Sequence, residues 1–349
     1  MQIKIEKLIY GGNGAGEIDG KKVFVPLSAP GDILDVEIVG DHKTWSEAKI
    51  LSVVETASCR VTNKCPVFGT CGGCQWQHLS YDTQLEWKRS ILKETLEHIG
   101  GIENPEVLPT LASPKQWNYR NKIQLHVDSK GRIGFYKPKS KEVVEFDECY
   151  IADESLNAKL NEKREKYSKR DRGVALRVED GPAFVQINSG QNEQIKKVIS
   201  EWIADLPHSS ILELYAGAGN FTFEIAKMAD RTVASDVDKI AIAIAKERAR
   251  ALGLSNIEFI RSSSGKAAKR MQGDCDLLLM DPPRKGCADA IADILNLKPK
   301  SIIYISCNPA TLARDMSDLN AGGYHFQKSM PVDMFPQTYH IESINLLSR

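Results

Sequence analysis

The sequence predicts an α/β protein in three parts, in which a doubly wound sheet forms the carboxyl-terminal domain. Three observations predict this organisation: glycine-punctuated alternating segments at 1–56, a cysteine-bearing and then basic region at 57–188, and a succession of strand-like and helix-like segments within 189–349. With 42% hydrophobic and 26% charged residues, the 349-residue chain has the composition of a globular protein large enough for several domains.

Residues 1–56 predict a small β-barrel. In KKVFVPL and DILDVEIVG, alternation places every second side chain on one face of a strand, and glycine-rich turns separate these segments. The stretch holds six Lys and nine Asp or Glu residues, so it is net acidic.

The central region, 57–188, contains a cluster of cysteines. Three lie within ten residues and a fourth follows far downstream: Cys65, Cys71, Cys74 and Cys149. In a chain without an export signal, thiols this dense indicate a metal site rather than disulfides. Four thiolates suit zinc or an iron–sulfur cluster, and the lack of a second C-x-x-C pair favours the cluster. The other isolated cysteines are expected to be packing residues: Cys59, Cys275 and Cys287.

Basic and aromatic residues alternate between Ser113 and Lys141. The stretch contains eight basic residues and one acidic residue, Asp128. Its aromatic residues are Trp117, Tyr119, Phe135 and Tyr136. Because Lys plus Arg equals Asp plus Glu, at 46 each, any nucleic-acid site must be local. This stretch predicts either an RNA surface or a solvated, strand-rich face. The charged segment 159–173 that follows predicts a solvated helix or a linker.

From Ile211 onward, strand-like segments alternate with helical ones. The strand-like segments are ILELYAG, RTVASD, IEFIRS, CDLLLMD and SIIYISC. This order is typical of a parallel, doubly wound sheet with helices on both faces. Such sheets bind ligands beyond the carboxyl ends of their strands.

The loop ELYAGAGNFT, 213–222, follows the first of these strands. Gly217 and Gly219 allow the backbone to approach a nucleotide-like ligand, but Thr222 stands where a dinucleotide fingerprint has its third glycine. Asp236, at the end of the next strand, is the residue type that binds a ribose. Together these features favour S-adenosylmethionine over NAD as the ligand.

The segment LLLMDPPRKG, 277–286, offers a second strand-end acid, Asp281, followed by two prolines. A rigid turn without function is the alternative interpretation. Methyltransferases that act on exocyclic amines often carry an aromatic residue after such prolines. Here the residue is Arg284, which makes amine methylation less favoured.

Cys307 closes the strand SIIYISC, where it would face the donor site. Uracil C5 is a poor nucleophile, but addition of a thiolate at C6 would activate it, and a carboxylate or imidazole would then remove the C5 proton. A nucleophilic role would call for a lowered thiol pKa. A small buried packing residue is the alternative.

Over nearly its whole length the chain resembles the RNA uracil-5-methyltransferase family, most closely the branch that modifies 23S ribosomal RNA. The motifs SCNPATLARD and PVDMFPQTYHIESINLLSR carry the resemblance. It implies a Rossmann-like S-adenosylmethionine methyltransferase domain, an amino-terminal TRAM-like OB barrel and a central α+β domain bearing a cluster. It also implies that Cys307 is the nucleophile and Glu342 the base, with His340 near enough to share the site.

The same resemblance implies ligands for two cofactors. The donor, S-adenosylmethionine, would be bound by Gln186, Tyr215, Asn220, Asp236 and Asp281. A [4Fe-4S] cluster would be held by Cys65, Cys71, Cys74 and Cys149.

The sequence therefore predicts an enzyme that makes 5-methyluridine in RNA, with ribosomal RNA favoured and transfer RNA as the alternative. One rival is methylation of another base, such as a guanine amine, and a second is an iron–sulfur RNA-binding protein without catalysis. We expect a cytoplasmic protein without an obligate protein partner, because its start lacks a signal peptide and no run approaches the roughly 18 apolar residues of a membrane span.

Overall fold

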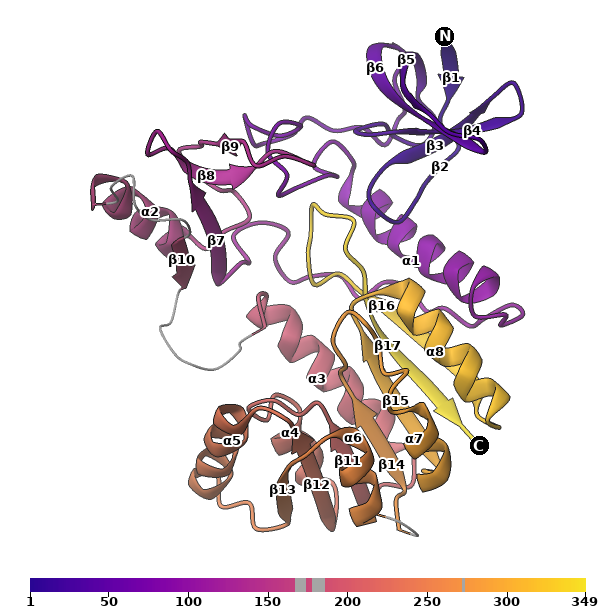
Figure 1. The fold of residues 1–349 in the computed structure, drawn as a ribbon, viewed down its shortest axis with the longest axis vertical. Coiled ribbons are helices and arrows are strands. Elements are labelled where there is room, and N and C mark those ends of the chain that lie inside the picture. The colour runs from indigo at the N-terminus through magenta and orange to yellow at the C-terminus, as the bar shows by residue number, and fades with distance from the viewer. Residues whose placement is uncertain (167–173, 178–185, 272–273) are drawn as a thin grey trace.

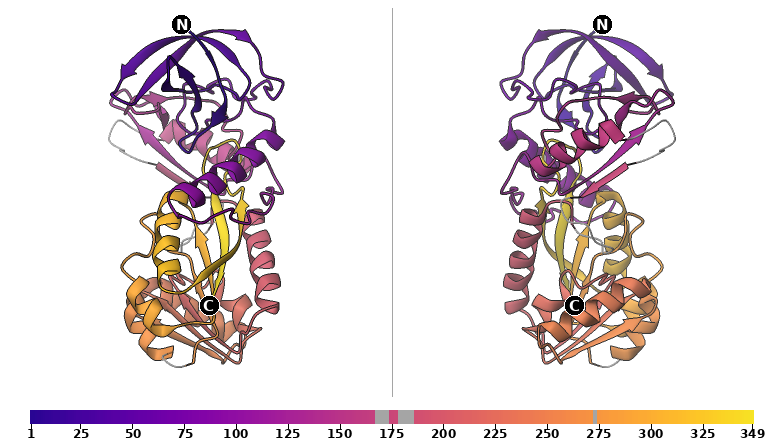
Figure 2. Two further views of the ribbon diagram at one scale, coloured as in Figure 1. Left: turned by 90° about the vertical axis from the view of Figure 1, so that its right-hand side faces the viewer. Right: turned by 90° about the vertical axis from the view of Figure 1, so that its left-hand side faces the viewer.

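The computed structural model describes residues 1–166, 174–177, 186–271 and 274–349. Figures 1 and 2 show an elongated molecule with the amino-terminal barrel at one end, the carboxyl-terminal sheet at the other and the central region between them. Within the described residues, no helix has the length and apolar character that crossing a membrane requires.

The amino-terminal strands form one six-stranded sheet with the order β1-β5-β6-β4-β3-β2. Their bounds are β1 (Gln2–Lys4), β2 (Lys7–Leu8), β3 (Gly14–Ile18), β4 (Lys21–Val25), β5 (Ile33–Asp41) and β6 (Trp45–Glu55). Since successive side chains point to opposite faces, alternate residues such as Val23, Val25, Leu34 and Val36 fill a common core. The expected strand-rich barrel is confirmed.

The central region combines a small sheet with two helices. The sheet order is β10-β7-β8-β9. The bounds are α1 (Tyr81–His98), β7 (Lys122–Val127), β8 (Ile133–Tyr136), β9 (Val143–Val144), α2 (Glu154–Lys166) and β10 (Val174–Arg177). Helix α2 confirms the helical interpretation for the first part of 159–173, and 167–173 lies outside the described residues.

The carboxyl-terminal domain is built on a seven-stranded sheet with the order β13-β12-β11-β14-β15-β17-β16. The strands are β11 (Ser210–Leu214), β12 (Arg231–Asp236), β13 (Ile257–Arg261), β14 (Leu277–Met280), β15 (Ser301–Ser306), β16 (His325–Val332) and β17 (Glu342–Ser348). The first five are parallel, as predicted. Strand β17 runs antiparallel to both of its neighbours, β15 and β16, and one loop joins it directly to β16.

Helices cover both faces of this sheet. They are α3 (Ser189–Ala204), α4 (Thr222–Ala226), α5 (Lys239–Ala251), α6 (Ser264–Ala268), α7 (Ile291–Leu297) and α8 (Pro309–Ala321). In β14, Leu278 and Met280 pack towards α6, α7 and α8, while Leu277 and Leu279 pack towards α3 and α4. Helix α1 joins the first group through Leu92, so it connects the central region to the sheet.

Candidate active site

The glycine loop leaves the carboxyl end of β11 in a left-handed conformation. Tyr215, Gly217 and Gly219 all have positive φ, at 62°, 55° and 86°. A Cβ added at Gly217 would meet open space, so the backbone there is open to a ligand. The Gly217 N–H donates to the Asp236 carboxylate at 2.8 Å, which fixes the loop against the end of β12.

Glu213 lies in β11 beneath this loop and was not predicted as a functional residue. It is buried and accepts a hydrogen bond from the Thr222 hydroxyl. Burial raises its pKa to about 8, and the nearby charges of Asp281 and Asp236 act in the same direction. Three carboxyl groups therefore gather at this edge of the sheet.

The other residues predicted to bind S-adenosylmethionine each lie in a different environment. Asn220 exchanges two amide hydrogen bonds with Asn192 of α3, at 2.8 and 3.0 Å, so its side chain fastens the loop to that helix. Tyr215 packs against the core around β14, and burial raises the pKa of its phenol to about 12. Gln186 precedes α3, and its carbonyl accepts a 2.7 Å hydrogen bond from the Asn121 amide.

Asp281 follows β14 and begins the loop that runs through Arg284. Burial raises the pKa of its carboxyl to about 7. The Arg284 carbonyl accepts hydrogen bonds from the side chains of Asn308 and Thr311, at 3.2 and 3.1 Å. These bonds tie the loop after β14 to the segment that follows β15.

Cys307 is placed between the end of β15 and the start of α8. Asn308 caps α8, because its side chain accepts the Ala310 N–H at 3.1 Å. The thiol is half-buried, and its pKa is raised first by burial and then by the charges of Glu342 and Asp281, while Arg284 opposes the shift. Its pKa is therefore raised rather than lowered as expected of a nucleophile.

Glu342 is the first residue of β17 and lies beside Cys307. Ser306 pairs with Ser343 in the antiparallel register of β15 and β17. Cys307, which follows Ser306, and Glu342, which precedes Ser343, therefore stand opposite one another. The Glu342 side chain is 8% exposed. Burial raises its pKa to about 8.

Charged neighbours from two segments, the loop after β14 and helix α1, also shift the pKa of Glu342. The charge of Asp281 after β14 raises it further, whereas Lys88 from α1 and Arg284 lower it. Glu342 thus lies among two cations and one acid while its own side chain is shielded from water.

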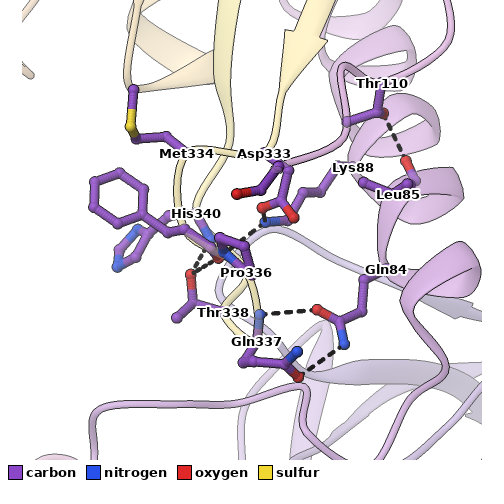
Figure 3. Close-up of polar contacts among 12 residues, drawn as sticks. Gln84, Leu85, Lys88, Thr110, Asp333, Met334, Pro336, Gln337, Thr338 and His340 are labelled. Atoms are coloured by element: carbon purple, nitrogen blue, oxygen red, sulfur yellow. Dashed lines mark hydrogen bonds and ion pairs between the residues drawn. The ribbon is translucent and has the colours of Figure 1, made fainter. Parts of the chain in front are cut away.

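A loop supported by α1 leads into Glu342. Lys88 of α1 makes a fully buried ion pair with Asp333, and Gln84 exchanges hydrogen bonds with Gln337 at 3.1 and 2.9 Å (Figure 3). Removing either member of a buried pair leaves the other charge unpaired, so these contacts hold the loop firmly. Lys88 was not predicted, since one lysine in a polar helix gives no local signal.

His340 lies in this loop, two residues before β17 begins at Glu342. Its ring packs near Phe335 and Tyr339, with ring centroids 5.6 and 4.4 Å away. Burial lowers the pKa of His340 to about 4, and Arg284, Lys88 and Arg120 lower it too. The imidazole is therefore neutral at physiological pH.

The four clustered cysteines line a single cavity in the central region. Within the described ranges, no group of three or more His, Cys, Asp or Glu side chains is arranged as ligands of one metal ion, so a [4Fe-4S] cluster is not shown. The cavity lining nevertheless includes all four predicted thiols: Cys65, Cys71, Cys74 and Cys149. Arg120 also lines it, and its buried Nε has no hydrogen-bond partner in the structure.

The remaining cysteines pack as predicted. Cys275 and Cys287 are buried in the core of the carboxyl-terminal sheet. Cys59 is half-buried at the edge of the cluster that includes Trp76.

The aromatic residues of the basic stretch are less available to RNA than predicted. Tyr119 is buried and donates its hydroxyl to the Pro336 carbonyl at 3.0 Å. Phe135 stacks on Phe146 inside the central core. The alternation of basic and aromatic residues in the sequence does not show which rings are buried. The basic charge of the stretch, rather than these two rings, remains as a predicted RNA contact.

A glycine loop and strand-end acids on a doubly wound sheet fit the class of S-adenosylmethionine-dependent methyltransferases. Within that class, the chain belongs to the tRNA (uracil-5-)-methyltransferase family, whose model matches residues 162–349. A TRAM domain matches residues 1–51. The family resemblance and the TRAM-like barrel predicted from the sequence are confirmed.

Relatives and a solved structure match along the whole chain. Uncharacterized RNA methyltransferases of Halalkalibacterium halodurans and Bdellovibrio bacteriovorus are 30% and 31% identical, over 99% of this chain and 96% and 94% of theirs. The crystal structure of Pyrococcus abyssi tRNA (uracil-54, C5)-methyltransferase in complex with S-adenosyl-L-homocysteine is 28% identical, with a TM-score of 0.78 over 99% of this chain and 100% of that one. The chain is an S-adenosylmethionine-dependent RNA methyltransferase.

Proposed function

We propose that this protein methylates C5 of uridine in RNA, with Cys307 as the nucleophile and Glu342 as the base. The observation that carries the proposal is the register of β15 and β17, which sets the thiol opposite a shielded carboxyl group. A nucleophile and a base in adjacent positions are what addition to C6 and proton removal from C5 require.

The proposed reaction begins with loss of the Cys307 thiol proton to water. The thiolate adds to uracil C6, and the C5=C6 electrons move through C5 onto the C4 carbonyl oxygen. When bound, S-adenosylmethionine supplies the methyl group that the activated C5 accepts. Glu342 then takes the C5 proton, the C5–H electron pair restores the C5=C6 bond, and the thiolate leaves C6.

Two features of the site favour the thiolate despite the raised thiol pKa. Arg284 lowers the pKa of Cys307, and the thiol directly precedes the amino-terminal cap of α8, where the helix dipole stabilises negative charge. A cationic methyl donor bound nearby would add to this effect. Thiol ionisation would then depend on whether the donor is bound.

We propose that the donor is held at the edge formed by the glycine loop, Asp236 and Asp281. Asp236 already fixes the loop through the Gly217 N–H, and its position at the end of β12 suits a ribose. Tyr215 and Gln186 are proposed as further contacts with the donor. Asn220 would act by holding the loop, since Asn192 engages both groups of its amide.

Wild-type protein is expected to form a covalent adduct with RNA that carries 5-fluorouridine at the target position. The C5 fluorine cannot leave as a proton, so the bond between Cys307 and C6 persists after methyl transfer. A denaturing gel with labelled RNA would reveal the adduct, and mass spectrometry would assign it to Cys307. Release of S-adenosylhomocysteine without any adduct would contradict the covalent route.

The RNA substrate has two candidates. Ribosomal RNA is favoured by the sequence resemblance, whereas the likeness to the Pyrococcus abyssi enzyme, which acts on transfer RNA, favours transfer RNA as the second candidate. Mapping 5-methyluridine in both RNAs, with and without the gene, would identify the substrate.

We also propose that the central cavity holds a [4Fe-4S] cluster. The donor set fits, because four thiols line one cavity, and the unpartnered Nε of Arg120 is placed to donate to a thiolate-bound, anionic group. When bound, such a cluster would cross-link the segments that carry these cysteines.

Protein isolated without oxygen is expected to contain about four iron atoms per chain, as a [4Fe-4S] cluster requires. Replacing Cys149 with Ser should lower the iron content and the visible absorption, whereas Cys59→Ser, which changes a cysteine outside the cavity, should leave both unchanged. Metal analysis and absorption spectra provide the measurement. Stoichiometric zinc, or equal iron in the Cys149 variant, would contradict the proposal.

A further inference from the structure

The turn between β2 and β3 brings the amino-terminal barrel to the candidate active site. The Ile9 N–H donates to the Asn13 carbonyl at 2.9 Å and closes this turn, residues 9–13. The Gly12 carbonyl accepts a 3.1 Å hydrogen bond from the indole of Trp76, which follows the cysteine cluster. The turn is therefore attached to the body of the enzyme.

Gly12 makes an unusually close approach possible. Its φ is +94°, and a Cβ added there would lie 3.1 Å from the side chains of both Gln75 and Tyr339. Only glycine adopts this conformation without strain and leaves room for these side chains. Tyr339 belongs to the loop that leads into Glu342, so the barrel turn lies against the loop that carries the candidate base.

Tyr10 is at the tip of this turn, and its ring is only partly covered. It meets Tyr339 edge to face, with ring centroids 5.5 Å apart and an angle of 88° between the rings. The side chain is still 37% exposed. Burial raises the pKa of its phenol, the charges of Tyr339 and Cys307 raise it further, and Arg284 opposes the shift. An aromatic surface is thus available beside the loop that leads into the candidate base, Glu342.

The net acidic charge of the barrel disfavours a role in holding phosphates. Residues 1–56 contain six Lys and nine Asp or Glu residues. Lys7 and Lys21 pair with Glu94 and Asp41, while Lys139 of the central region pairs with Glu47. The barrel is therefore better suited to contact a base than a phosphate backbone.

We propose that Tyr10 is a binding residue for the target base, with its ring packed against the pyrimidine that Cys307 attacks. Every base presents a π-face to an aromatic ring, and such contacts contribute substantially to binding of unstacked nucleotides. The barrel would then complete the base site of the carboxyl-terminal domain, although Tyr10 and Cys307 are 297 residues apart in sequence. This inference rests on the proposed function and adds to it a residue from the TRAM domain.

The test compares two versions of the RNA that the mapping experiment identifies, one with the target uridine and one with an abasic ribose at that position. Tyr10→Ala should weaken binding of the uridine RNA roughly 5- to 150-fold and leave binding of the abasic RNA unchanged. Tyr10→Phe keeps the ring and should bind both like wild type. Trp45→Ala, which removes a barrel ring that packs against His42 and Phe24, should show no base-dependent effect.

A second variant moves the turn without removing the ring. Gly12→Ala should lower affinity for the uridine RNA selectively, because its Cβ displaces the turn from Tyr339. Equal losses for both RNAs with Tyr10→Ala, or no loss for either, would overturn the proposal. Failure of the proposed function would look different: wild type itself would then bind both RNAs equally and form no adduct with 5-fluorouridine RNA.

Discussion

Replacing Cys307 with Ala is expected to abolish methyl transfer while donor binding persists. Without the thiolate, uracil C5 has no route to the activated state, and loss of a nucleophile costs roughly 10⁴-fold or more in turnover. Donor binding should persist because the glycine loop is fixed by Asp236 and not by Cys307. Release of S-adenosylhomocysteine measures the first effect, and calorimetric titration with S-adenosylmethionine measures the second.

The matched control for this substitution is Cys275→Ala. Cys275 is buried just before β14, at the edge of the sheet opposite the site, so its loss should affect stability more than turnover. Retained turnover in the Cys307 variant would favour direct methylation of another acceptor, such as an exocyclic amine. Loss of donor binding would instead indicate that the thiol supports the donor site.

The order of strands and loops could be read from the sequence because parallel α/β units repeat a local pattern. The strand ends at Asp236, Asp281 and Cys307 follow directly from that repeat, and the parallel register brings them to one edge. The acid at 236 contacts the glycine loop as the pattern suggests. These predictions needed only the alternation of strand and helix segments and the parallel direction of the strands.

The position of Glu342 needed more than the repeat. It depends on β17 entering the sheet antiparallel to β15, and no local pattern specifies that pairing. The family motif supplied the residue, and the structure supplied its neighbours. Lys88 lies 245 residues before its partner Asp333, so their buried pair has no signature in either segment.

For the clustered cysteines and the basic stretch, too, local spacing predicted which residues lie together but not which of them are buried. Spacing predicted that Cys65, Cys71 and Cys74 act together, and they line one cavity. Spacing could not tell that Tyr119 is buried, because an aromatic residue between lysines suits a surface and a covered strand equally. Whether Tyr119 is buried depends on the segments that pack against it, and one of these, at Pro336, is distant in sequence.

Replacing Glu342 with Gln is expected to stop the reaction after methyl transfer. The amide cannot accept the C5 proton, so the methylated base should stay bound to Cys307, and turnover should fall about 10²- to 10⁴-fold, the range for a general base. Gln has nearly the same size as Glu, so the buried position should tolerate it. A single equivalent of S-adenosylhomocysteine, and a denaturation-resistant adduct with unmodified RNA, would be the measured results.

The wild-type rate of proton removal should also depend on pH in a defined direction. Glu342 must be ionised to act as a base, and its pKa is raised to about 8, chiefly by burial. The fraction of active carboxylate therefore rises with pH and levels off above about 8. In single-turnover experiments, the rate of adduct breakdown should rise with pH in the wild type. In the Gln variant this rate should not depend on pH in the same range.

The control, Glu258→Gln, changes a surface acid that pairs with Arg231 and should leave the rate and its pH profile unaltered, because exposed pairs contribute little. If Glu342→Gln turned over within a few-fold of wild type and accumulated no adduct, His340 would become the candidate base. Its pKa near 4 predicts a different profile, flat through neutral pH, because the imidazole is already unprotonated there. The pH dependence of adduct breakdown thus distinguishes a carboxylate made more basic by burial from an imidazole made less basic by it.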